Sequence, residues 1–124
     1  MRVLALEHIQ LAMPAGEERR ARDFYETILG VPERPKPAEL AARGGVWFER
    51  GDLKIHLGVD GKFRPARKAH PALLVVGLAE LIATLKAAGH PVREEPLAGF
   101  RRAYTEDPFG NRIELMERET KPPQ

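Results

Sequence analysis

Three histidines and one glutamate occur in four strand-like segments of the sequence, one in each segment. Strand side chains alternate between two faces, so in NRIELME the carboxylate of Glu114 points away from the face that carries Ile113 and Leu115. If the apolar faces pack on helices, the four polar side chains share the open face of a sheet. Imidazole nitrogens and a carboxylate together are ligands that Zn, Mn, Fe, Ni or Co ions accept. The sequence therefore predicts a divalent-metal site formed by His8, His56, His70 and Glu114.

The segments that carry these residues follow one order of elements, which occurs twice. In the first half the pattern predicts a strand at 6–13, an amphipathic helix at 15–30, a short edge strand in the Pro-rich stretch, and a hairpin of strands at 46–50 and 53–59. In the second half it predicts a strand at 70–76, a helix at 77–90, a short strand at 91–96 and a final hairpin across PFG.

The two halves are offset by nearly constant distances along the chain. His70 follows His8 by 62 residues, Gly89 follows Gly30 by 59, and Glu114 follows His56 by 58. An internal repeat of this kind indicates two copies of one unit, each leaving a sheet face and edge for the other to cover. The prediction is an α+β fold of two βαβββ modules, at about 3–60 and 69–118, within one domain that spans residues 1–124.

Composition narrows the classes of function. The chain has 124 residues, of which 43% are hydrophobic and 31% charged, as in a folded soluble domain. It has no cysteine, which excludes disulfides, Cys-based zinc sites and thiol nucleophiles. A formal charge of +2 with mixed signs argues against nucleic acid, and the first ten residues fit neither a signal peptide nor a membrane span. A cytoplasmic protein is expected.

Four stretches of this chain resemble the vicinal oxygen chelate superfamily, and the resemblance extends over about residues 3–118. This superfamily includes glyoxalase I, fosfomycin-resistance proteins, bleomycin-binding proteins and extradiol dioxygenases. The resemblance implies a glyoxalase-like fold, in which the two modules form a cupped, eight-stranded mixed sheet. The matching stretches are EHIQLAMP, FYETILG, AHPALLVV and DPFGNRIELME.

The resemblance also implies roles for individual residues. Metal-dependent members place ligands at the positions of His8, His70 and Glu114. Glyoxalase I carries a carboxylate where this chain has His56, so His56 is expected to act as a fourth ligand or a general base. The implied function is a divalent-metal-dependent isomerase, lyase or transferase that acts on a small oxygen-rich metabolite or antibiotic. Glu114 and His56 are the predicted catalytic residues, and the implied assembly is a homodimer.

Two other functions stay open at this point. One is a metal-free protein that sequesters a small molecule, as bleomycin-resistance proteins do. In such a protein the histidines would not bind a metal, and single histidines in strands are most often structural. An extradiol-type Fe(II) dioxygenase would use two histidines and one carboxylate. Basic and aromatic residues are candidates for substrate contacts, although the basic stretch KFRPARK also fits a solvated linker. The predicted substrate-binding residues are Arg67, Lys68, Arg102 and Tyr104.

Overall fold

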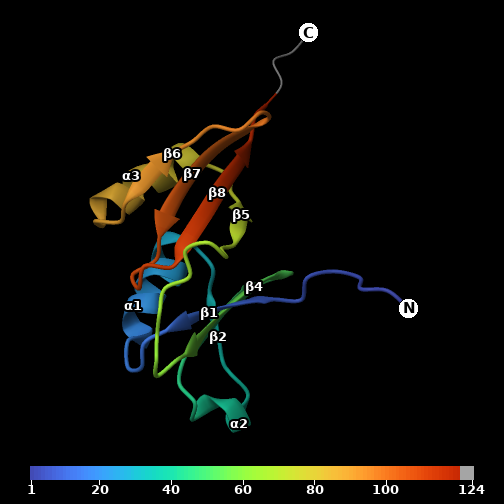
Figure 1. The fold of residues 1–124 in the computed structure, drawn as a ribbon, viewed down its shortest axis with the longest axis vertical. Coiled ribbons are helices and arrows are strands. Elements are labelled where there is room, and N and C mark those ends of the chain that lie inside the picture. Colours follow the sequence, from blue (N-terminus) through green and yellow to red (C-terminus); the bar gives the residue numbers. More distant parts are fainter. Residues whose placement is uncertain (121–124) are drawn as a thin grey trace. The chain divides into compact units, whose positions relative to one another are not determined.

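The computed structural model describes residues 1–120, which fold as two compact units. The first unit is Met1–Pro65, and the second begins at Ala66 (Figure 1). Each unit contains four strands in one mixed sheet, so the predicted eight strands and the βαβββ repeat are confirmed. Over the described residues, no helix is long and apolar enough to span a membrane.

The first sheet has the strand order β1-β4-β3-β2. Its central strands form the predicted hairpin across the RGD turn, and β1 pairs with β4 in parallel. The predicted helix at 15–30 is an α-helix that continues as a π-helix and ends at Gly30, whose φ is +77°. The elements of this unit are β1 (Ile9–Met13), α1 (Glu18–Arg22), the π-helix η1 (Asp23–Ile28), β2 (Glu33–Arg34), α2 (Ala38–Ala41), β3 (Val46–Arg50) and β4 (Leu53–Val59).

One face of the first sheet and the helical segment form the core of this unit. Phe24 and Tyr25 of η1 are fully buried, and the Tyr25 ring stacks on Phe48 of β3 with 5.3 Å between centroids. Ile55 and Leu57 point into the same core from β4, as their alternation predicts. His56 therefore points to the opposite face of the sheet.

The second sheet repeats this arrangement with the strand order β5-β8-β7-β6. Helix α3 buries Leu78, Ile82 and Leu85, and it ends before Gly89, whose φ is +86°. Ile113 and Leu115 of β8 are fully buried, which leaves Glu114 on the other face. The elements of this unit are β5 (Ala72–Leu74), α3 (Leu78–Ala87), β6 (Val92–Glu94), β7 (Phe100–Glu106) and β8 (Arg112–Arg118).

The strands of each unit pair in an equivalent register. Gln10 of β1 pairs with His56 of β4, and Ala72 of β5 pairs with Glu114 of β8. Each histidine that opens a module, His8 or His70, lies two residues before the paired position. Residues that correspond in the sequence repeat thus also have corresponding partners on the neighbouring strand.

Two strand boundaries differ from the prediction. The predicted strand at 6–13 begins only at Ile9, and the one at 70–76 spans only Ala72–Leu74. Residues 1–8 pair with no strand, and Pro71 has no backbone N–H to donate to a ladder. Both histidines consequently lie just before their strands.

The DPFGN segment is a buried turn between β7 and β8. Oδ1 of Asp107 accepts hydrogen bonds from the backbone N–H groups of Phe109 and Asn111, each at 2.9 Å, and Oδ2 accepts one from the Asn111 side chain at 2.9 Å. Oδ1 of Asn111 in turn accepts a hydrogen bond from the backbone N–H of Ala66 at 2.9 Å. This network fixes where β8 begins, and with it the position of Glu114.

Candidate functional site

His70 and Glu114 form a close pair on the open face of the second sheet. Nε2 of His70 lies 2.9 Å from Oε1 of Glu114, and their side chains are only 20% and 12% exposed. Their contact follows from the register, since Glu114 pairs with Ala72 and the His70 side chain lies on the same face two residues earlier. The sequence predicted both residues as ligands.

A backbone carbonyl orients the His70 ring. Nδ1 lies 2.9 Å from the carbonyl oxygen of Lys68. A carbonyl can only accept, so Nδ1 carries the proton and Nε2 is the nitrogen directed at Glu114. Metal-binding histidines in proteins are usually oriented by an acceptor of this kind on the second ring nitrogen.

The spacing of this pair fits a divalent ion. Two donors that each lie ~2.1 Å from one ion are about 3 Å apart when their bonds meet near a right angle. The observed 2.9 Å between Nε2 and Oε1 meets that requirement without a change of backbone. The same distance is the length of an ordinary hydrogen bond. His70 and Glu114 can therefore keep one arrangement whether they share a proton or bind an ion.

Arg102 contacts the second oxygen of the same carboxylate. Its Nη1 donates to Oε2 of Glu114 at 3.3 Å, and its Nε donates to the carbonyl of Glu95 at 2.8 Å. The guanidinium lies 5.2 Å from the ring centroid of Tyr104. The structure thus places Arg102, a predicted substrate contact, where it holds Glu114 in one orientation.

In the first unit, His56 is the middle ring of a stack of three. Trp47, its partner across β3 and β4, lies 4.0 Å away with the ring planes 4° apart, and His8 lies 4.4 Å away on the β1 side. The His56 residue is 5% exposed. Stacking on both neighbours restricts rotation of the imidazole.

Glu49 engages His56 from the neighbouring strand. Its Oε2 lies 2.6 Å from Nε2 of His56, and the Glu49 side chain is 22% exposed. Glu49 and Trp47 lie on one face of β3 because they are two residues apart. The geometry is that of a carboxylate–histidine dyad, in which Nε2–H donates to Glu49 and Nδ1 is the remaining basic nitrogen.

The segment before β1 is held by charge. Nζ of Lys54 lies 2.6 Å from Oε2 of Glu7, and Nδ1 of His8 lies 3.3 Å from Oε1 of the same carboxylate. The hydrogen bond from Lys54 lowers the pKa of the exposed Glu7 carboxyl below its ordinary value, and the same bond raises the pKa of Lys54. His8 is therefore placed beside His56 by its neighbour Glu7 as well as by stacking.

The four predicted ligands are brought together as two pairs, one in each unit. His8 contacts His56, and His70 contacts Glu114. Within neither unit, over the described residues, do three His, Asp or Glu side chains gather around one point. By register His56 and Glu114 occupy equivalent positions, as do Trp47 and Tyr104.

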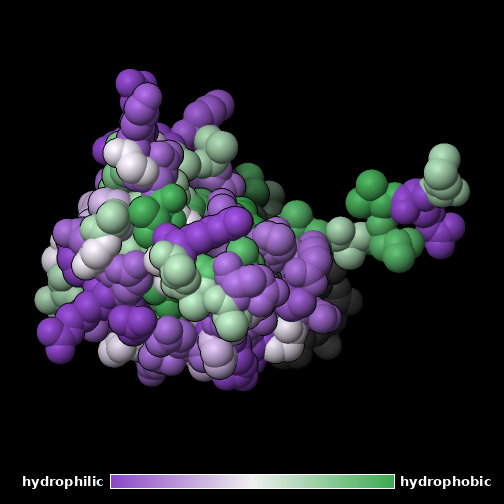
Figure 2. All heavy atoms as spheres, turned by 90° about the horizontal axis from the view of Figure 1, so that it is seen from below, coloured by the Kyte–Doolittle hydropathy of each residue, from purple (hydrophilic) through white to green (hydrophobic). Residues whose placement is uncertain are grey.

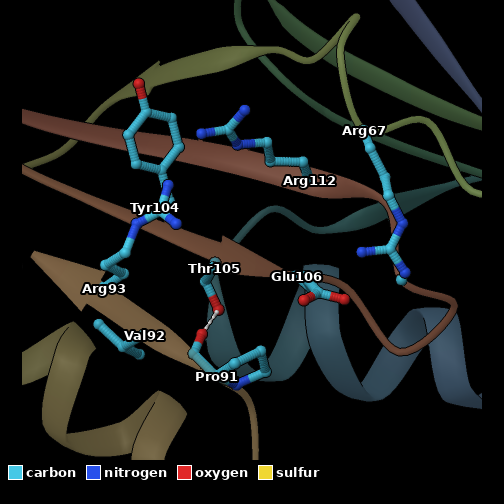
Figure 3. A pocket seen from close by; sticks show the side chains of 9 residues that line it. Arg67, Pro91, Val92, Arg93, Tyr104, Thr105, Glu106 and Arg112 are labelled. Carbon is cyan, nitrogen blue, oxygen red and sulfur yellow. Dashed lines mark hydrogen bonds between the residues drawn. The ribbon is translucent and has the colours of Figure 1, made fainter.

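The four predicted substrate contacts all lie in the second unit, but only two of them line its cavity. Arg67 and Tyr104 line a cavity of about 360 Å³ (Figure 3). Lys68 is exposed, and its carbonyl oxygen is the acceptor for His70. Arg93 of β6 and Arg112 of β8 also line this cavity.

Three residues of these clusters were absent from the predicted sites. Glu49, Arg93 and Arg112 were not assigned a role, although alternation already placed Arg112 on the face of Glu114. For Glu49 and Arg93 the missing information was strand register, which decides whether two side chains on neighbouring strands are adjacent or several residues apart.

Comparison with known proteins gives a consistent set of relatives among solved structures. A crystal structure of a glyoxalase family protein from Bacillus anthracis is 43% identical, with a TM-score of 0.89, and the alignment covers 96% of this chain and all of that one. A glyoxalase/dioxygenase from Nostoc punctiforme is 24% identical with a TM-score of 0.75, over 97% and 99% of the two chains. A genomically encoded fosfomycin resistance protein from Listeria monocytogenes is 19% identical with a TM-score of 0.75, over 95% and 96%. The last two support the fold alone. No protein-family model and no curated protein matches the sequence.

Proposed function

Because this chain belongs to the glyoxalase family of the vicinal oxygen chelate superfamily, we propose that it is a divalent-metal-dependent enzyme of lyase, isomerase or transferase type. Its substrate is a small, oxygen-rich metabolite or antibiotic. The ligands are His8, His70 and Glu114, with His56 as a general base or fourth ligand.

The observation that carries the proposal is the His70–Glu114 pair. Two donors of the correct chemical type lie at chelating distance, and the Lys68 carbonyl directs Nε2 toward the carboxylate. Arg102 holds the other carboxylate oxygen, so Glu114 cannot rotate freely away from the ring. A metal-free binding protein has no need for an oriented imidazole of this kind.

The chemistry divides between binding and proton transfer. A bound divalent ion supplies Lewis acidity, which polarises a substrate oxygen. His56 holds a proton on Nε2 against Glu49, and its Nδ1 can accept a second proton as a general base. Glu49 stabilises the positive imidazole that results. The stack with Trp47 and His8 keeps the His56 ring in one orientation while its charge changes.

Metal titration of the parent protein tests the proposal directly. Protein purified without chelator should contain a stoichiometric first-row metal by elemental analysis. After chelator treatment, calorimetric titration with Zn²⁺, Ni²⁺, Mn²⁺ and Co²⁺ should give at least one ion with a Kd below ~100 μM. If every ion binds more weakly, the sequestration alternative replaces the enzyme.

A homodimer is part of the proposal. Segment 1–6 exposes large apolar side chains, which are green in the arm at the right of Figure 2. Leu74 at the end of β5 is also exposed, and β1 and β5 are edge strands of their sheets. A second copy of the chain is a natural cover for such surfaces. The exposed large apolar residues in or next to these segments are Met1, Val3, Leu4, Leu6, Leu74 and Val76, and Leu97 before β7 is exposed as well.

Light scattering coupled to size exclusion checks the assembly. The expected mass is twice the 13.9 kDa of one chain. Replacing Leu4 and Leu6 by serine should shift the protein toward monomer, whereas Ala83→Ser on the exposed face of α3 should leave the mass unchanged. A parent protein that stays monomeric at micromolar concentration refutes the dimer.

A further inference from the structure

A positively charged cavity lies on the open face of the second sheet. It has a volume of about 360 Å³ and is formed only by residues of the second unit. Figure 3 shows the side chains of Arg67, Arg93 and Arg112 around it, with Glu106 on the floor and Tyr104 at one end. Three guanidinium groups against one carboxylate give the lining an excess of positive charge.

Two of these arginines lack an acidic partner among residues 1–120. Arg93 donates to Glu95 at 2.5 Å, but no carboxylate among the described residues forms an ion pair with the side chain of Arg67 or Arg112. Arg112 is half-buried, and its guanidinium lies 4.1 Å from the ring centroid of Tyr104. A half-buried cation supported only by an aromatic face has unused hydrogen-bond donors directed at whatever enters the cavity.

Tyr104 organises the arginines. Arg93, Arg102 and Arg112 all lie within 5.5 Å of its ring centroid. The guanidinium planes lose little further freedom when they bind an oxyanion, because cation–π contact already restricts them. Arg102 is occupied by Glu114, so Arg112 is the arginine of this group that remains available.

Arg67 is placed by its neighbour in the chain. The backbone N–H of Ala66 donates to Oδ1 of Asn111 at 2.9 Å, and its carbonyl accepts from the backbone N–H of Arg112 at 2.8 Å. These two hydrogen bonds tie the basic stretch KFRPARK to the start of β8. The segment that looked like a solvated linker thus delivers one guanidinium to the cavity.

The cavity adjoins the His70–Glu114 pair. Arg112 precedes Glu114 by two residues on the same face of β8, and Tyr104 is the register partner of Glu114. Two residues along a strand span about 7 Å, which a small molecule can bridge. A molecule with an oxyanion in the cavity could therefore present a second oxygen at Glu114.

We propose that this cavity is an oxyanion subsite, in which Arg112 and Arg67 hold a carboxylate, phosphate or phosphonate group of the substrate. The proposal rests on the proposed function for the role of that group, and it names the substrate class as small anionic oxygen compounds. Arginine suits all three groups because its planar fork donates two parallel hydrogen bonds to one oxyanion. Tyr104 positions Arg112.

Binding of simple anions to the full chain tests the subsite without metal. Chelator-treated, isotope-labelled protein is titrated with inorganic phosphate, methylphosphonate or acetate, at constant ionic strength set by sodium chloride, and followed by amide chemical shifts. Saturable shifts are expected at Arg67, Tyr104 and Arg112. The anion that binds most tightly assigns the group, and because no metal takes part, failure of the metal titration does not affect this result.

Charge-matched variants separate a built site from general attraction. Arg112→Gln and Arg67→Gln should each weaken binding at least ~10-fold, since each removes a charge-assisted hydrogen bond. Arg112→Lys should weaken it severalfold despite unchanged charge, because the fork is lost. The control is Arg101→Gln, which removes an exposed charge from the face of β7 opposite Tyr104 and should leave the Kd within about twofold.

Two results would overturn the proposal. One is a linear, non-saturable shift with all three anions. The other is an equal loss of affinity in Arg101→Gln and Arg112→Gln, which would mean that net charge alone attracts the anion. Arg67 is exposed, and its side chain forms no hydrogen bond or ion pair with another described residue, so Arg67→Gln keeps the test valid even if Arg112→Gln fails to fold.

Discussion

The Glu114→Gln variant should bind its divalent ion about 100-fold more weakly than the parent protein. Glutamine keeps the shape of the side chain but removes the charge and one strong oxygen donor from the pair with His70. Loss of a residue that merely supports a ligand already costs roughly 10–100-fold in metal affinity, so loss of the ligand itself should lie at the upper end of that range. Calorimetric titration with the metal that the parent binds best gives the ratio.

The matched control for this variant is Glu106→Gln. Glu106 lies on the same face of β7 as Tyr104 and carries the same charge. Among the described residues, its backbone carbonyl, and not its carboxylate, is hydrogen-bonded to a histidine, His90, at 3.1 Å. Its replacement should change the Kd by less than about twofold, through long-range charge only. If both variants lose affinity equally, or if Glu114→Gln binds like the parent, Glu114 is not a ligand.

Glu49→Gln in the same assay separates the two roles proposed for His56. If His56 is a general base, metal affinity should stay near that of the parent, because among the described residues the Glu49 carboxylate is hydrogen-bonded to His56 and to no other predicted ligand. If His56 is a fourth ligand, Glu49 supports a ligand and its loss should weaken binding roughly 10-fold or more. We expect the first result, because within its unit, over the described residues, His56 belongs to no group of three His, Asp or Glu side chains that could hold an ion.

The Asp107→Ala variant should lose about 3 kcal/mol of unfolding free energy, which corresponds to an increase of roughly 100-fold in the unfolded-to-folded ratio. Asp107 is 3% exposed, and its carboxylate accepts two backbone hydrogen bonds and one from the Asn111 side chain. Alanine leaves these donors buried without an acceptor. Urea denaturation followed by far-ultraviolet circular dichroism measures the change.

Asp60→Ala is the control for the turn. Asp60 also accepts a backbone hydrogen bond from the residue two positions later, Lys62, at 2.8 Å, but it is exposed and water can replace it. Its loss should cost less than about 1 kcal/mol. If Asp107→Ala is too unstable to purify, Asp107→Asn, which keeps one acceptor oxygen, should show an intermediate loss. Equal stability of the two alanine variants would contradict the structural role of the DPFGN turn.

The sequence by itself determined the βαβββ repeat and the face on which each strand residue lies. Alternation over seven residues in β4 and in β8 is enough to place His56 and Glu114 opposite the core, because the strand period is two and helices cover only one face. Glycines at the helix ends and the DPFGN turn set the boundaries of the elements. These signals are local, so they can be read from one chain without knowing its neighbours.

Only the tertiary structure decided which of these side chains touch. Alternation gives the face of a side chain but not the register between strands that are distant in sequence, and register is set by long-range hydrogen bonds and core packing. That is why Glu49 beside His56, and Arg93 and Arg112 around Tyr104, were not expected. The placement of Arg67 likewise depends on two hydrogen bonds between Ala66 and residues more than forty positions away, one donated and one accepted by Ala66, which no local pattern records.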